Sequence, residues 1–131
     1  MLSFSTCSKK ANNIEVALAT NNWSDVLKDL KKNKILIKNY KGFNGESILH
    51  VVCSKGYHDN HIESIIDFLI KNGADLNDQD ANGKTPLHCA AFYGLNPRTY
   101  SQLLSYGADE SIIDKDGKSP QDYKKGKKGM N

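Results

Sequence analysis

A chain of 131 residues is long enough for one compact domain. It contains no run of about 20 apolar residues, which a membrane-spanning helix needs, and residues 1–10 lack the apolar stretch of a signal peptide. We therefore expect a protein of the cytosol, or of the nucleus, with no membrane partner. Three cysteines without a CxxC pair argue against a disulfide framework or zinc ribbon, and we expect Cys53 and Cys89 to be small core residues.

The formal net charge of +3 conceals a separation of charge along the chain. Residues 1–42 carry eight lysines and three acids, residues 43–116 five basic and eleven acidic residues, and residues 117–131 five lysines and one aspartate. A partner could therefore meet either sign. Arg98 is the only arginine, and arginine is the residue that reads phosphates and base edges through paired hydrogen bonds, so sequence-specific nucleic-acid binding is disfavoured.

Residues 10–32 show two apolar patterns with helical spacing. The first comprises Ile14, Ala17 and Leu18, and the second Trp23, Val26, Leu27 and Leu30. Asn21 or Asn22 could form the tight turn between them, because asparagine tolerates the left-handed backbone region. We expect a degenerate first helix pair here.

Two phrases then recur in one frame. The first is Asn44-Gly45-Glu46-Ser47-Ile48-Leu49-His50, which returns as Asn82-Gly83-Lys84-Thr85-Pro86-Leu87-His88 and in part as Asp116-Gly117-Lys118-Ser119-Pro120. The second is Asn72-Gly73-Ala74-Asp75, which returns as Tyr106-Gly107-Ala108-Asp109. The spacings are 38 and 34 residues for the first phrase and 34 for the second. A fixed period of this size indicates stacked structural repeats, each of which buries one face against the next.

Each repeat begins its first helix at a hydroxyl residue suited to the N-cap position. These caps are Ser47, Thr85 and Ser119, and Pro86 and Pro120 follow two of them at the first helical position. We expect short helices over residues 49–53 and 87–91, with left-handed ends at Gly56 and Gly94.

The second helix of each repeat is more apolar. Its stripe comprises Ile62, Ile65, Ile66 and Leu69 in one repeat and Tyr100, Leu103 and Leu104 in the next. The interval from Gly56 to Gly73 is 17 residues, whereas that from Gly94 to Gly107 is 13. We therefore expect an exposed loop insertion near residues 57–61.

The phrases Asp80-Ala81-Asn82-Gly83-Lys84-Thr85-Pro86-Leu87-His88-Cys89-Ala90-Ala91 and Leu103-Leu104-Ser105-Tyr106-Gly107-Ala108-Asp109 resemble the signature of the ankyrin-repeat family. The resemblance implies an all-α solenoid of stacked helix–turn–helix units with hairpin-like loops. We expect a flexible N-terminus at 1–9, an ankyrin-repeat domain at 10–123 and a basic tail at 124–131. Within the domain we expect a capping repeat at 10–40, a repeat with the insertion at 43–78, a further repeat at 80–113 and a truncated one at 114–123.

Three patterns could indicate chemistry, and we interpret each as structural. Asp78–Gly83 matches the start of a calcium loop, but its twelfth position is Cys89 instead of glutamate. His58, Asp59 and His61 lack a fourth metal ligand nearby. For His50 and His88 the resemblance implies hydrogen bonds near the helix caps that tie neighbouring loops together. With no nucleophile elbow and no phosphate-binding glycine loop, we predict a protein that is not an enzyme and holds no cofactor and no metal.

The resemblance also implies where a partner binds, namely on the hairpin fingertips and the inner face of the first helix of each pair. By position, this surface comprises Phe43, Asn44, Glu46, Ser54, Lys55, Ala81, Asn82, Lys84, Phe92, Tyr93, Lys115, Asp116 and Lys118. Phe92 and Tyr93 are the strongest candidates because aromatic side chains bury a large area at low entropic cost, although packing against the neighbouring repeat is an alternative for both. The fingers also carry acids that favour a partner with a basic patch: Asp75, Asp78, Asp80, Asp109 and Asp114.

These features predict a protein-interaction module, an adaptor or a small accessory subunit of a large assembly, monomeric when free. The alternative hypothesis is salt-sensitive association with RNA or a ribonucleoprotein through the basic N- and C-terminal segments, including Lys124–Lys128. The basic tail has no interleaved aromatic residues, so base stacking is not supported.

Overall fold

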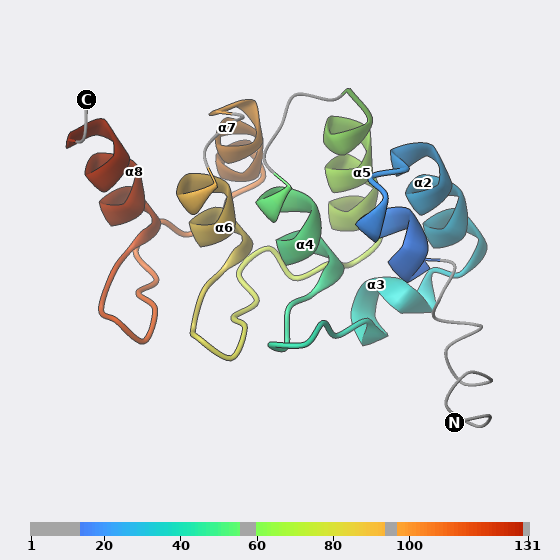
Figure 1. Cartoon of the computed structure of the whole chain (residues 1–131), viewed down its shortest axis with the longest axis horizontal. Coiled ribbons are helices and arrows are strands. Elements are labelled where there is room, and N and C mark those ends of the chain that lie inside the picture. Colours follow the sequence, from blue (N-terminus) through green and yellow to red (C-terminus); the bar gives the residue numbers. More distant parts are fainter. Residues whose placement is uncertain (1–13, 56–59, 94–96, 130–131) are drawn as a thin grey trace.

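The computed structural model describes residues 14–55, 60–93 and 97–129, with side chains apart from those of residue 60 and residues 125–129. Within these ranges every regular element is a helix, which confirms the predicted all-α architecture. The helices form an elongated stack that runs from α2 at one end to α8 at the other, and hairpin loops project from one side of it (Figure 1). The segment 1–9, expected to be flexible, lies outside the described residues.

The first helix pair consists of a helix over residues 14–19 and of α2 (Trp23–Lys32). Asn21 takes the turn between them with φ 57°, and the Asn22 side chain caps α2 by accepting the Asp25 N–H. The expectation of an asparagine in a left-handed turn is confirmed at Asn21, whereas the capping role of Asn22 was not predicted. The predicted stripes are buried at Ile14, Ala17, Leu18, Trp23, Val26 and Leu30.

A short helix that the sequence analysis did not predict follows α2. It is α3 (Ile35–Asn39), which buries Ile37 and leaves Ile35 62% exposed. Three consecutive apolar residues over 35–37 fit neither a helical stripe nor strand alternation, so the pattern gave no signal.

The remaining helices form two rows. The inner row holds α4 (Ile48–Ser54), α6 (Pro86–Phe92) and α8 (Pro120–Gly129), and the outer row holds α5 (Asn60–Lys71) and α7 (Pro97–Ser105). α4 packs against α6 and α6 against α8, while α5 backs α4 and α7 backs α6. The two rows bury a continuous apolar layer, as expected when each repeat covers the next.

The outer helices bury the predicted stripe residues. Ile62, Ile65, Ile66 and Leu69 are at most 1% exposed. The burial of each of these side chains stabilises the folded state by about 1.5–3 kcal/mol. α5 has 12 residues and α7 has 9, so the predicted insertion partly lengthens a helix: residues 60 and 61 belong to α5. Residues 57–59 and the glycines at 56 and 94 lie outside the described ranges.

The last helix is longer than the sequence analysis indicated. α8 extends to Gly129, whereas the tail was expected to begin at residue 124. Its cap is the predicted one, because the Ser119 hydroxyl accepts the Asp122 N–H at 3.4 Å. The basic run Lys124–Lys128 therefore continues α8.

Candidate functional site

Three hairpins, at residues 42–46, 80–84 and 114–118, are joined into one row by backbone hydrogen bonds. The Ala81 N–H donates to the Asn44 carbonyl at 2.8 Å, and the Lys115 N–H donates to the Asn82 carbonyl at 3.0 Å. Gly83 turns the middle hairpin with φ 78°, a backbone conformation that side chains resist. An added Cβ there would also lie 3.1 Å from the backbone nitrogen of Lys115. The row is thus a fixed edge rather than a set of independent loops.

An aspartate shapes each of the last two hairpins from inside. Asp80 Oδ1 accepts the N–H groups of Asn82 and Lys84, both at 2.9 Å. Asp114 Oδ1 accepts the equivalent pair, from residues 116 and 118, at 2.9 and 3.0 Å. These carboxylates therefore hold backbone donors within their own turns.

In the first hairpin a carboxylate also accepts a backbone N–H group, but a different residue supplies it. Gly42 occupies the position of the aspartate, and Glu46 Oε1 accepts the Asn44 N–H at 2.7 Å. A Cβ at Gly42 would lie 2.7 Å from that oxygen, so the glycine makes room for the Glu46 side chain. Glu46, predicted as a partner-binding residue, thus also shapes its hairpin.

His88 connects its own helix cap to the next hairpin. Its Nδ1 accepts the Thr85 N–H at 3.0 Å, and its Nε2 lies 2.9 Å from the Lys118 carbonyl oxygen. Because Nδ1 accepts, the ring hydrogen is on Nε2 and is donated to Lys118. The ring is fully buried, so both bonds form away from water.

The same device recurs in the preceding repeat. The Ser47 N–H donates to His50 Nδ1 at 3.1 Å, and His50 Nε2 lies 2.7 Å from the Lys84 carbonyl oxygen. The tying role that the resemblance implied for both histidines is confirmed. In the fourth repeat Asp122 occupies this position, and its Oδ2 accepts the Ser119 N–H at 2.8 Å.

A pocket of about 140 Å³ opens between α4 and α6 above this row of hairpins. Seven predicted partner-binding residues line it: Asn44, Glu46, Ser54, Asn82, Lys84, Phe92 and Tyr93. Four further lining residues were not predicted for this surface: His50, Val51, Asp80 and Cys89. The other predicted residues do not line the pocket: Phe43, Lys55, Ala81, Lys115, Asp116 and Lys118.

Two half-exposed aromatic rings form one wall of the pocket. Phe92 is 43% and Tyr93 47% exposed, and their rings meet edge to face with centroids 4.9 Å apart. Phe92 also meets Tyr123 of α8 edge to face at 5.7 Å. Phe92 therefore packs against the neighbouring repeat and still presents a large part of its surface.

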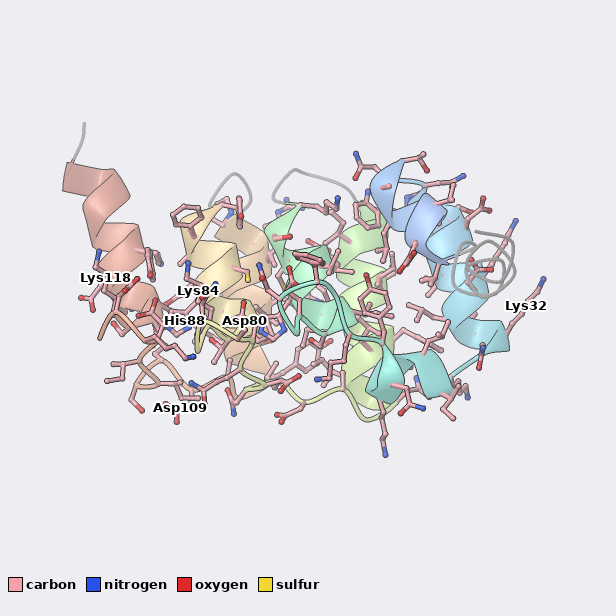
Figure 2. All side chains as sticks on the ribbon, turned by 60° about the horizontal axis from the view of Figure 1, so that its bottom comes forward. Lys32, Asp80, Lys84, His88, Asp109 and Lys118 are labelled. Atoms are coloured by element: carbon pink, nitrogen blue, oxygen red, sulfur yellow. The ribbon has the colours of Figure 1, made fainter. Side chains whose placement is uncertain are left out.

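Lysines lie over these rings. Lys84 Nζ is 5.2 Å from the centroid of Phe92 and 5.4 Å from that of Tyr123. Lys118 Nζ is 5.7 Å from the centroid of Tyr123. Figure 2 shows Lys84 and Lys118 on neighbouring hairpins at one end of the stack, with Lys32 at the opposite end.

The comparison with known proteins agrees with this geometry. Residues 14–120 match the family model described as ankyrin repeats in three copies. The chain belongs to the ankyrin-repeat family. Ankyrin repeats are generally protein–protein interaction modules, and the described residues contain no helix long and apolar enough to cross a membrane.

Several curated relatives contain ankyrin repeats similar to this chain. The ankyrin repeat protein FPV244 of fowlpox virus (strain NVSL) is 31% identical over 122 residues, which cover 76% of this chain and 18% of the relative. The target of rapamycin complex 2 subunit AVO2 of Saccharomyces cerevisiae is 34% identical over 87 residues, 64% of this chain and 19% of the relative. Ankyrin repeat domain-containing protein 53 of Mus musculus is 41% identical over 68 residues, 47% of this chain and 14% of the relative. The chain spans less than a fifth of each.

Sequence reasoning missed Tyr123 of α8, whose ring packs against Phe92 beside the pocket and lies under the ammonium groups of Lys84 and Lys118. Its hydroxyl donates to Asp114 Oδ2, and burial together with this bond raises the pKa of Tyr123. The sequence contained a signal for this residue, because Tyr123 lies 34 residues, one repeat spacing, after Cys89. We had interpreted residues 114–123 as a truncated repeat, and that interpretation assigned no role to this position.

The cysteines of the ankyrin core are free and buried, as predicted. Burial, followed by the charge of Asp80, raises the pKa of Cys89 to about 12, although Lys84 opposes the shift. Burial likewise raises the pKa of Cys53. Both thiols therefore remain protonated at neutral pH and are weak nucleophiles.

The fingertip acids have partners within the chain. The Asn77 N–H donates to Asp75 and the Ser111 N–H to Asp109, at 3.0 and 2.8 Å. Asp78 lies 3.4 Å from Lys41 Nζ. The part of the chain described by the structure holds no group of three or more potential metal-ligating side chains, and His58 and Asp59 lie outside it.

Proposed function

We propose that this chain is a non-enzymatic protein-binding module, an adaptor or a small accessory subunit of a larger assembly. It receives its partner in a groove that consists of the α4–α6 pocket and the adjoining ring of Tyr123 on α8. The observation that carries the proposal is the pair of half-exposed rings, Phe92 and Tyr93, at the wall of the α4–α6 pocket. Aromatic side chains in a concave, partly desolvated site are typical centres of binding energy.

The frame around these rings is suited to binding without rearrangement. The hairpins are bonded to one another, and His50 and His88 each join a helix cap to the following hairpin. A surface that is already ordered loses little conformational entropy when a partner binds, so more of the contact energy appears as affinity.

The side chains of the groove favour binding over catalysis. Both nitrogens of each buried histidine are engaged in structural bonds, and the thiol of Cys89 is held protonated. This leaves the pocket without an activated base or nucleophile. The two free buried thiols also suit a reducing compartment, which supports a site of action in the cytosol or the nucleus.

The accessory-subunit role is supported by one relative, whose name describes it as a subunit of target of rapamycin complex 2. Because the match covers 19% of that relative, the partner of this chain is a question for experiment.

The test is affinity capture from the native cell extract with the wild-type chain and with Phe92→Ala/Tyr93→Ala, at low and moderate salt. A matched control is Lys31→Ala/Lys32→Ala, since these exposed residues lie on α2 at the far end of the stack. We expect wild type and control to retain the same protein at moderate salt. The groove variant should lose it while its far-ultraviolet circular dichroism stays helical.

Two outcomes would contradict the proposal. Capture that survives the groove substitutions would remove the surface assignment. Recovery of RNA or ribosomal material alone, lost at moderate salt, would favour the basic terminal segments instead.

A further inference from the structure

We propose that the partner segment held in this groove is acidic and places a carboxylate between Lys84 and Lys118. This inference rests on the proposed function and names the chemistry of the partner. The partner with a basic patch, expected from the fingertip aspartates, is the alternative outcome of the test.

Three side chains occupy equivalent places along the groove, one in each hairpin. They are Glu46, Lys84 and Lys118, each one residue before a helix cap. The row is therefore negative at α4 and positive from α6 to α8. Because the hairpins are bonded to one another, this order of charges is fixed in space.

The two ammonium groups converge on one aromatic ring. Lys84 Nζ and Lys118 Nζ lie 5.4 and 5.7 Å from the centroid of Tyr123. Ring contacts attract a cation but leave its charge uncompensated. Among the described residues neither ammonium has a carboxylate within the 4.0 Å of an ion pair.

Three of the acids around these lysines accept hydrogen bonds from groups of their own hairpin or helix cap. Asp80 and Asp114 accept backbone N–H groups inside their own hairpins, and Asp114 also accepts the Tyr123 hydroxyl. Asp122 accepts the Ser119 N–H at the cap of α8. These carboxylates keep their charge but are held within their own turns by the groups they accept. An incoming carboxylate can therefore form the ion pair that Lys84 and Lys118 lack.

The surroundings specify more than charge. Phe92 and Tyr123 form an apolar surface beside the two ammonium groups, which suits a segment in which acidic and apolar side chains stand close together. Glu46 would repel a second acid at the α4 end, so the acidic part of the segment should lie over α6 and α8. Both cations here are lysines, which lack the guanidinium fork that reads base edges, so sequence-specific recognition of RNA is not favoured at this site.

The test uses a random dodecapeptide display library selected against the full chain. The baits are wild type, the reversal variant Lys84→Glu/Lys118→Glu, the neutral variant Lys84→Gln/Lys118→Gln and the control Lys31→Glu/Lys32→Glu. The reversal and the control change the net charge equally. We expect wild type and control to enrich peptides rich in Asp and Glu, and the reversal variant to enrich none of these.

The most enriched peptide is then synthesised with a fluorescent label, and its affinity is measured by fluorescence polarisation. We expect the neutral variant to bind it about tenfold more weakly than wild type, and the control to differ by less than about twofold. A labelled single-stranded RNA dodecamer serves as the competing probe, and the neutral variant should bind it as wild type does.

The failures are distinguishable. Peptides without acidic residues that depend on Phe92 and Tyr93 would overturn the acidic segment and leave the groove in place. Peptides of any kind that still bind Phe92→Ala/Tyr93→Ala would overturn the proposed function itself. Enrichment of nothing above blank resin, or RNA binding that is lost with Lys84 and Lys118, would also overturn the acidic segment.

Discussion

Replacing His88 tests how the repeats are coupled. His88→Ala removes the acceptor for the Thr85 N–H and the donor for the Lys118 carbonyl, and it empties the volume of a fully buried ring. An unsatisfied buried group costs about 1–3 kcal/mol, a lost cap about 0.5–2 kcal/mol, and the cavity adds to both. Allowing for non-additivity, we expect a loss of about 3–5 kcal/mol in the free energy of unfolding.

A second substitution separates the cap from the bridge. In His88→Asn the side-chain amide oxygen can still accept the Thr85 N–H, but the shorter side chain cannot reach Lys118. We therefore expect a smaller loss, about 1.5–3 kcal/mol, which keeps the prediction testable if the alanine variant fails to fold.

The assay for both variants is urea unfolding followed by circular dichroism. Lys32→Ala is the control, since substitution of an exposed residue should change the free energy by less than about 0.5 kcal/mol. An asparagine variant as stable as wild type would refute the bridging role. Equal losses in both variants would refute the separate contribution of the cap.

Two further stability predictions follow from the hairpins. Gly83→Ala should cost more than Gly117→Ala: both positions have positive φ, but a Cβ meets the Lys115 nitrogen at 3.1 Å in the first case and nothing within 4 Å in the second. The urea concentration at the unfolding midpoint should therefore be highest for wild type, lower for Gly117→Ala and lowest for Gly83→Ala. The reverse order of the two variants would contradict the contact with Lys115. Burial raises the pKa of Asp114, but hydrogen bonds from Tyr123 and from backbone N–H groups outweigh it, so the net pKa lies below its usual range. The stability from this carboxylate is present at neutral pH and is lost as the pH falls below about 4. Tyr123→Phe should therefore destabilise the protein by about 1–2 kcal/mol at pH 7 and by less at pH 3, and an equal loss at both pH values would contradict the link.

The repeat frame and the helix caps could be predicted from the sequence because both depend on local residue types at fixed spacing. Ser47 and Thr85 cap the helices as expected, and Asn21 takes the left-handed turn. The apolar stripe from Ile62 to Leu69 is buried because helical periodicity decides which face meets the next repeat.

The features that escaped prediction depend on contacts between repeats. The position of Tyr123 over Lys84 and Phe92 is set by the packing of α8 on α6, which no local pattern encodes. The inward turn of Asp80 was missed for a related reason. Its charge is visible in the sequence, but the backbone donors that engage it appear only once the hairpin is formed.

The lining of the α4–α6 pocket was predicted in part. Position within the repeat correctly brought Glu46, Lys84 and Phe92 to one pocket. Position within the repeat could not show which of the thirteen candidates lie outside the pocket. Phe43 is one of these, and it is fully exposed at a fingertip. Whether the residues of the pocket bind a partner remains the central prediction.

The most direct test of that prediction is amide hydrogen exchange, measured by mass spectrometry, on the chain alone and in complex with the partner recovered by capture. We expect the complex to slow exchange in peptides that cover residues 82–93 and 118–124, and to leave α2 (Trp23–Lys32) unchanged. Protection confined to α2, or to the outer helices α5 and α7, would contradict the account.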